Sequence, residues 1–94
     1  MPDDYDSRPV RPDGLAVRRL RHEHGWAPHA LIDAIGEASV VSTGLRATIT
    51  PNQLQGIEEH GERVPYQTLC LVASGLGCDP VDILLEERNE EESA

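Results

Sequence analysis

The sequence predicts an all-helical fold in which five short helices pack as an orthogonal bundle around one core. Apolar residues recur at helical spacings in several segments, and Gly, Pro or a capping residue separates each segment from the next. The chain has 94 residues, enough for one domain. Because it contains no Phe, the core must be aliphatic, with Trp26 as its one large aromatic anchor.

The chain is expected to begin with a flexible N-terminal arm over residues 1–13. This segment is rich in Pro and Asp and has almost nothing to bury. Asp13 is a good N-cap for the first helix, in which Val17 and Leu20 share one face. Gly25 ends this helix.

The second helix is expected to start at Pro28 and to stop at Gly36. Its apolar stripe comprises Ala30, Leu31, Ala34 and Ile35. Residues 37–49 then form an insertion rich in β-branched side chains, with Thr43 and Gly44 between two apolar stretches. A small β-hairpin and an irregular loop fit this insertion about equally well.

The third helix has the clearest start signal in the chain. Thr50 is followed by Pro51 at the first helical position and by Gln53 three residues on, which together make a capping box. Leu54 and Ile57 then point to the same side. We therefore expect a helix whose first turn carries polar side chains and whose inner face is apolar.

Two more helices complete the domain, which is expected to span residues 14–87. The fourth opens at Pro65 and has a strong helical period, formed by Leu69, Val72, Ala73 and Leu76. Asp79 and Pro80 start a short fifth helix, whose apolar side is expected to comprise Val81, Leu84 and Leu85. Residues 88–94 are expected to be an acidic, disordered tail.

Charge is the main observation against a nucleic-acid partner. The formal net charge is −9, whereas phosphate contacts need Lys and Arg. Most of the excess lies in the arm and at the C-terminus, so the body is only mildly acidic. The chain has no Lys, and all strong cationic contacts must come from Arg, which forks onto phosphates and guanine edges.

The sequence carries no pattern that predicts an enzyme, a metal site or a bound cofactor. Cys70 and Cys78 are expected to be buried thiols, because both have apolar neighbours in the sequence. No group of Cys and His residues has the spacing of a zinc site. The four His residues are scattered, and no Ser or Cys nucleophile has a paired base. No apolar run is long enough to span a membrane and no signal peptide is evident, so we expect a soluble, cytoplasmic protein.

The second half of the chain resembles the lambda-repressor-like (Xre-type) helix-turn-helix family of DNA-binding domains. The residues that carry this resemblance are Ile57-Glu58, Gly61, Arg63-Val64-Pro65, Leu69, Val72-Ala73, Leu76-Gly77-Cys78-Asp79-Pro80 and Ile83-Leu84. Weaker similarity to the family's first two helices extends through Leu20-Arg21, Gly25-Trp26, Leu31 and Ile35-Gly36. The resemblance thus covers roughly residues 15–85.

The resemblance implies that the third helix enters the major groove of DNA. Base contacts would then come from Thr50, Asn52, Gln53 and Gln55, since short polar side chains at a recognition-helix start read base edges. The alternative is an ordinary solvated helix face with its cap. Phosphate contacts would come from His29, Arg46, His60 and Arg63. Arg21 and Glu58 match family positions that form a structural ion pair.

Three features depart from the family pattern. About fourteen residues separate Gly36 from Thr50, where the family has a tight turn. Ala27-Pro28 replaces the polar residues that often start the second helix, and one extra residue lies between Ile57 and Pro65. The long connection bears on the docking angle between the second and third helices, and Ala27-Pro28 offers no side chain for the phosphate contact that the family often makes there.

The resemblance implies a transcriptional regulator, most simply a repressor, that binds double-stranded operator DNA as a homodimer. The apolar residues without an obvious place in the bundle are Ile32, Val40, Val41, Leu45 and Ile49. The dimer contact is therefore expected in the insertion or in the fourth and fifth helices; an insertion folded onto its own domain is equally compatible. The rival function is a protein-interaction module, such as the antitoxin of a toxin–antitoxin pair or an acidic protein that mimics DNA or sequesters a basic partner.

Overall fold

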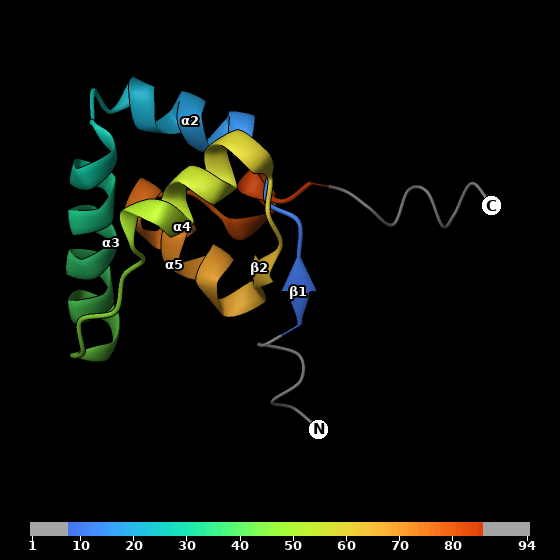
Figure 1. Ribbon diagram of the computed structural model, residues 1–94. Coiled ribbons are helices and arrows are strands. Elements are labelled where there is room, and N and C mark those ends of the chain that lie inside the picture. Colours follow the sequence, from blue (N-terminus) through green and yellow to red (C-terminus); the bar gives the residue numbers. More distant parts are fainter. Residues whose placement is uncertain (1–7, 86–94) are drawn as a thin grey trace.

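Helices make up most of the protein in the computed structural model, which describes residues 8–85 (Figure 1). The elements in chain order are strand β1 (Pro9–Val10), α2 (Gly14–Glu23), α3 (Pro28–Thr43), α4 (Pro51–Gln55), the π-helix η1 (Gly56–His60), strand β2 (Val64–Pro65), α5 (Tyr66–Leu76) and the 3₁₀-helix η2 (Pro80–Ile83). The prediction of a small helical domain is confirmed, but the two-stranded sheet was not predicted. In Figure 1, α3 lies along one side of α4 and α5, and the sheet lies on the opposite side.

The N-terminal segment is not a free arm from residue 8 onward, so the expectation for residues 1–13 is wrong there. β1 pairs antiparallel with β2, and Pro12 is fully buried in a bridge to Leu84. The backbone N–H of Asp13 donates to the carbonyl of Ile83 at 2.8 Å. Composition could not reveal this, because backbone pairing depends little on the side chains. The first seven residues and the tail at 88–94 lie outside the described residues.

α2 begins where the sequence predicted, and glycine lets it approach η1 closely. The Asp13 side chain accepts a hydrogen bond from the Ala16 N–H at 3.2 Å. A Cβ at Gly14 would overlap the backbone oxygens of Ile57 and Glu58. The start of α2 therefore packs backbone against backbone on η1.

α3 runs seven residues past its expected end, so the prediction of a hairpin or loop over residues 37–49 is wrong for 37–43. Gly36 lies inside the helix and is buried; the left-handed residue that ends it is Gly44, with φ 81°. Residues 44–50 have no regular structure. The Ser39 hydroxyl fixes this link, since it donates to the Leu45 carbonyl at 2.6 Å and accepts from the Ala47 N–H at 3.2 Å.

The core forms where α3 and α5 cross. A Cβ at Gly75 would lie 2.9 Å from the backbone of Ile35, so only glycine permits this approach. The largest fully buried side chains are Leu31, Ile35, Leu54, Ile57, Leu69, Ile83, Val17, Val72 and Pro12. In η2 it is Ile83 that enters the core, whereas Val81 and Leu85, which were expected to face inward, are exposed. Within residues 8–85, no helix has the length and apolar character needed to cross a membrane.

Candidate nucleic-acid interface

Arg21 and Glu58 form a buried, two-pronged ion pair between α2 and η1. Arg21 Nε donates to Glu58 Oε2 at 2.8 Å, and Nη2 donates to Oε1 at 2.9 Å. Arg21 Nη1 donates to the carbonyl of Trp26 at 2.8 Å. The hydrogen bonds that Arg21 donates to Glu58 raise the pKa of the Arg21 guanidinium, against the opposing effect of burial. This geometry fixes the angle between α2 and η1.

η1 continues α4 as one turn of π-helix, and this turn changes which side chains face inward. Gly56, Ile57 and Glu58 are consecutive and all buried, which the 3.6-residue period of an α-helix does not allow along one face. A π-turn adds one residue to a helical turn and so rotates the following side chains. Ile57 thereby reaches the core while Glu58 reaches Arg21. Gly61, with φ 60°, ends the turn.

The first turn of α4 carries the predicted capping box. Thr50 Oγ1 accepts from the Gln53 N–H at 3.1 Å, and Gln53 Oε1 accepts from the Thr50 N–H at 2.8 Å. Gln55 Nε2 donates to Glu59 Oε1 at a long 3.4 Å. Asn52 is exposed, and among residues 8–85 its side chain makes no hydrogen bond. Of the four predicted base-reading residues, Asn52 and Gln55 are thus best able to contact another molecule.

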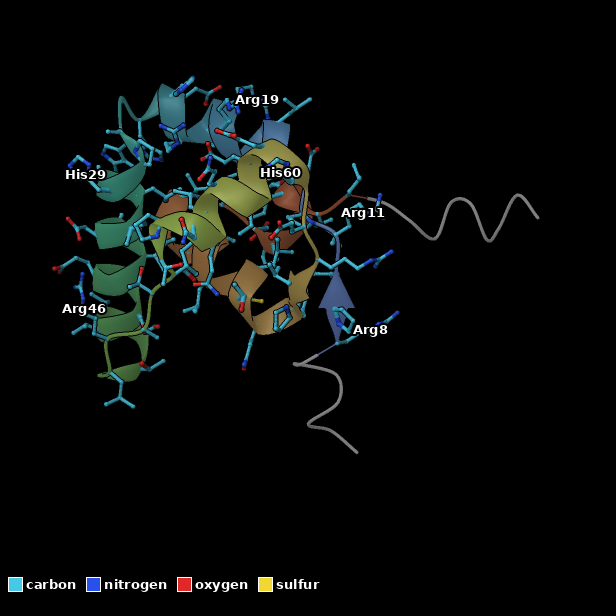
Figure 2. All side chains as sticks on the ribbon, viewed as in Figure 1. Arg8, Arg11, Arg19, His29, Arg46 and His60 are labelled. Atoms are coloured by element: carbon cyan, nitrogen blue, oxygen red, sulfur yellow. The ribbon has the colours of Figure 1, made fainter. Side chains whose placement is uncertain are left out.

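The predicted phosphate-contacting residues do not lie together. Figure 2 shows His29 and Arg46 along α3, whereas His60 lies apart from both, at the far end of η1. Arg63 is exposed and directly precedes β2. These four residues therefore do not form one continuous surface that could follow a DNA backbone.

Arg46 is turned back onto α3. Its guanidinium lies 3.5 Å from Asp33 and 3.7 Å from Glu37, and it covers Gly36 so closely that a Cβ there would overlap it. These two carboxylates already balance its charge. Arg46 therefore joins the 44–50 link to α3, a role that sequence reasoning missed because it placed Arg46 on an exposed loop.

A groove with a volume of about 510 Å³ runs along the junction of α2 with α4 and η1. Arg18 and His22 line it from α2, and Gln55 and Glu59 line it from the facing element. The Arg21–Glu58 pair forms its floor, and its remaining lining is Pro28, Pro51 and Leu54. Arg18 and His22 were not among the predicted site residues. Their spacing of four residues, which puts them on one face of α2, was the available signal.

The far end of α3 exposes an apolar surface, which we call the α3 tip (Val40, Val41 and Leu45). The exposed fractions of these side chains are 43%, 87% and 74%. Of the other apolar residues for which the sequence offered no place, Ile49 is buried in the core and Ile32 packs against it. The α3 tip is therefore the part of this group left open to a partner.

Within the part of the chain that the structure describes, no group of three or more His, Cys, Asp or Glu side chains could hold a metal ion. Comparisons with protein-family models, curated proteins and solved structures give no match for this chain. The chemistry of its surfaces is therefore the basis for a functional proposal.

Proposed function

We propose that this chain is a sequence-specific DNA-binding transcriptional regulator, a repressor, that reads the major groove with the helix starting after Thr50. The carrying observation is the start of α4, where a capping box fixes the backbone and Asn52 projects without an internal partner. An Asn side chain can bond an adenine edge through two hydrogen bonds. The buried Arg21–Glu58 pair holds this helix against α2, and such rigidity suits base reading.

The order of the helical pieces supports the finer proposal of a lambda-repressor-like helix-turn-helix fold. Five helical pieces follow one another: α2, α3, the continuous α4–η1, α5 and η2. The long connection between the second and third of these is taken up by the extension of α3 and by residues 44–50. The one extra residue before Pro65 fits a π-turn at η1, since such a turn accommodates one additional residue.

The proposal includes a homodimer formed through the α3 tip. One reading helix contacts only a few base pairs, and two-fold symmetry doubles the contact. Residues 38–45 carry no charge in a chain of net charge −9, so two copies would meet there with little local repulsion. The tip lies at the C-terminal end of α3, and α2 lies at the other end of that helix (Figure 1).

A protein-interaction module is the second candidate, and the same surface favours it. Exposed valine and leucine side chains grouped on one helix end are typical of protein–protein contacts. An antitoxin that binds a toxin through the α3 tip would use this surface without requiring DNA. An acidic protein that sequesters a basic partner would instead use the net charge of −9.

A gel-shift titration over a salt series tests the proposal. The duplexes are the DNA upstream of the chain's own gene and a scrambled duplex of equal length and composition. We expect the upstream duplex to bind more tightly, with affinity that falls steeply as salt rises. Binding to neither duplex at any salt concentration would reject the DNA-binding function and favour the protein-interaction module.

A further inference from the structure

The groove between α2 and α4–η1 combines a cationic wall with a position beside the proposed reading helix. Arg18 and His22 lie one turn apart on α2 and both line the groove. Pro51, the first residue of α4, lines it as well, and Asn52 is the next residue along the chain. Asn52 does not itself line the groove, so a group bound there would lie beside the first turn of the proposed reading helix.

The groove is lined by two arginines and two glutamates, and both arginines come from α2. Glu58 carries one negative charge, and Arg21 occupies both of its oxygens at 2.8 and 2.9 Å. Arg18 Nε forms a long ion pair with Glu58 Oε1 at 3.9 Å, without a hydrogen bond, on a carboxylate that Arg21 already binds. The three side chains thus form a cluster of net charge +1, whose outer member, Arg18, has a side chain that is 41% exposed.

Arg19 and Arg46 differ from Arg18 in that, within residues 8–85, the carboxylates beside them are not bound by a second arginine. Arg19 pairs with Glu23 at 3.8 Å, and Arg46 lies between two carboxylates. Within the groove, the opposing charge is Glu59 on the facing wall, where its Oε1 accepts from the Gln55 amide. The positive charges of the groove are therefore on its α2 side, and the negative charges are on its η1 side.

We propose that this groove binds a phosphodiester group of the DNA backbone, with the Arg18 guanidinium and the His22 imidazole as hydrogen-bond donors. The inference rests on the proposed function and adds to it a phosphate site outside the four phosphate-contacting residues expected from the sequence. A guanidinium matches the geometry of two phosphate oxygens. A phosphate held here fixes the register of α4 on the duplex without contributing to sequence preference.

The test compares Arg18→Gln with Arg19→Gln, because the two arginines are neighbours on α2 and only Arg18 lines the groove. Affinity for the upstream duplex and for the scrambled duplex is measured from 50 to about 300 mM salt. We expect Arg18→Gln to weaken both by roughly fivefold to tenfold near 0.1 M salt and to reduce the salt slope by about one. Arg19→Gln is expected to leave the slope unchanged.

His22→Gln provides a second variant, since His22 is exposed and its replacement leaves the ion pair intact. It is expected to weaken binding to both duplexes equally, because a phosphate contact carries no sequence preference. Thermal melts of all three variants show whether any loss of affinity comes from unfolding. Folded Arg18→Gln and His22→Gln variants that bind both duplexes as the wild type does would overturn the proposal.

Titration of the full chain with inorganic phosphate separates this inference from the function on which it rests. The readout is the NMR signal of the Arg18 Nε–H, with that of Arg19 as the reference. A saturable shift confined to Arg18, together with duplex binding, supports the phosphodiester site. Duplex binding without any shift at Arg18 overturns the groove alone. Failure of the wild type to bind any duplex overturns both.

Discussion

Arg21 on α2 and Glu58 on η1 share two parallel hydrogen bonds across 37 residues of chain, and both side chains are buried. A buried ion pair adds little net stability, because desolvation offsets its attraction, but removing one partner leaves an uncompensated charge. The pair therefore fixes the position of η1 relative to α2.

Glu58→Ala is expected to lower the free energy of unfolding by about 3–5 kcal/mol, since Arg21 would stay buried without its carboxylate. Denaturant titration followed by circular dichroism measures this. Glu59→Ala, at the exposed neighbouring position, is the control and should change stability by less than about 0.5 kcal/mol. Equal stability of the two variants would show that the pair is solvated in solution.

Asn52→Ala is expected to weaken binding to the operator by about 1–3 kcal/mol and to relax the preference at one base pair. Binding to scrambled duplex should hardly change, because Asn52 has no part in the charge of the surface. Gln67→Ala, which removes an exposed amide from α5, is the control. If Asn52→Ala keeps the full operator preference, α4 is not the reading helix.

Gln53→Ala has a different expected signature, because Gln53 closes the capping box. It should lower stability by about 1 kcal/mol through the lost cap and also weaken operator binding. Measuring unfolding and binding on the same sample separates the two effects. A loss of operator affinity without any loss of stability would show that the box does not persist in solution.

Cys78 gives a pH dependence whose sign is fixed by the structure. Burial, followed by the charges of Asp82 and Asp79, raises the pKa of the Cys78 thiol above its ordinary value. Because the pKa of the thiol is higher in the folded state, the protonated thiol contributes to the free energy of unfolding. This contribution is fully present below the pKa of a Cys in the unfolded chain, about 8.5. It is lost as pH rises from there through the folded pKa.

Wild type is therefore expected to lose stability in alkaline solution, and Cys78→Ala should remove part of that decline. Unfolding free energies at pH 7 and at several values above about 8.5 give the comparison. Cys70→Ala controls for the loss of a partly buried sulfur and should keep the wild-type decline. Parallel pH curves for wild type and Cys78→Ala would contradict the prediction.

Local signals in the sequence located most helix starts, because caps act over three or four residues. Asp13, Thr50 and Asp79 each stand at the N-cap where they were expected. The failures involve tertiary contacts. Gly36 resembles a helix stop, but its missing side chain makes room for the Arg46 guanidinium within a continuing helix. β1 was not predicted because its partner strand is distant in sequence: Val10 pairs with Val64, 54 residues away.

In the candidate site too, the features set by neighbouring residues were predictable and the features set by packing were not. The capping box at Thr50 and Gln53 follows from spacing alone. The groove does not, because its walls come from α2 and from α4–η1, and their separation depends on how those elements pack. Arg18 and Arg19 are alike in sequence, and only the packed structure distinguishes the arginine that lines the groove from its neighbour.

The α3 tip leads to the last prediction, which concerns the oligomeric state. Val41 and Leu45 are the most exposed members of the tip, and neither belongs to the core. Replacing both by Ser removes apolar area without adding charge, so the domain should keep its stability. We expect the wild type to sediment as a dimer in analytical ultracentrifugation and the double variant to sediment as a monomer.

Leu15→Ser is the matched control, because Leu15 is 75% exposed but lies at the start of α2 rather than on the tip. This variant should remain a dimer. A double variant that dimerises as the wild type does would move the contact to α5 and η2, where Val81 is the exposed apolar residue. A wild-type chain that stays monomeric at high concentration would contradict the dimer itself, and operator binding would then have to come from a single reading helix.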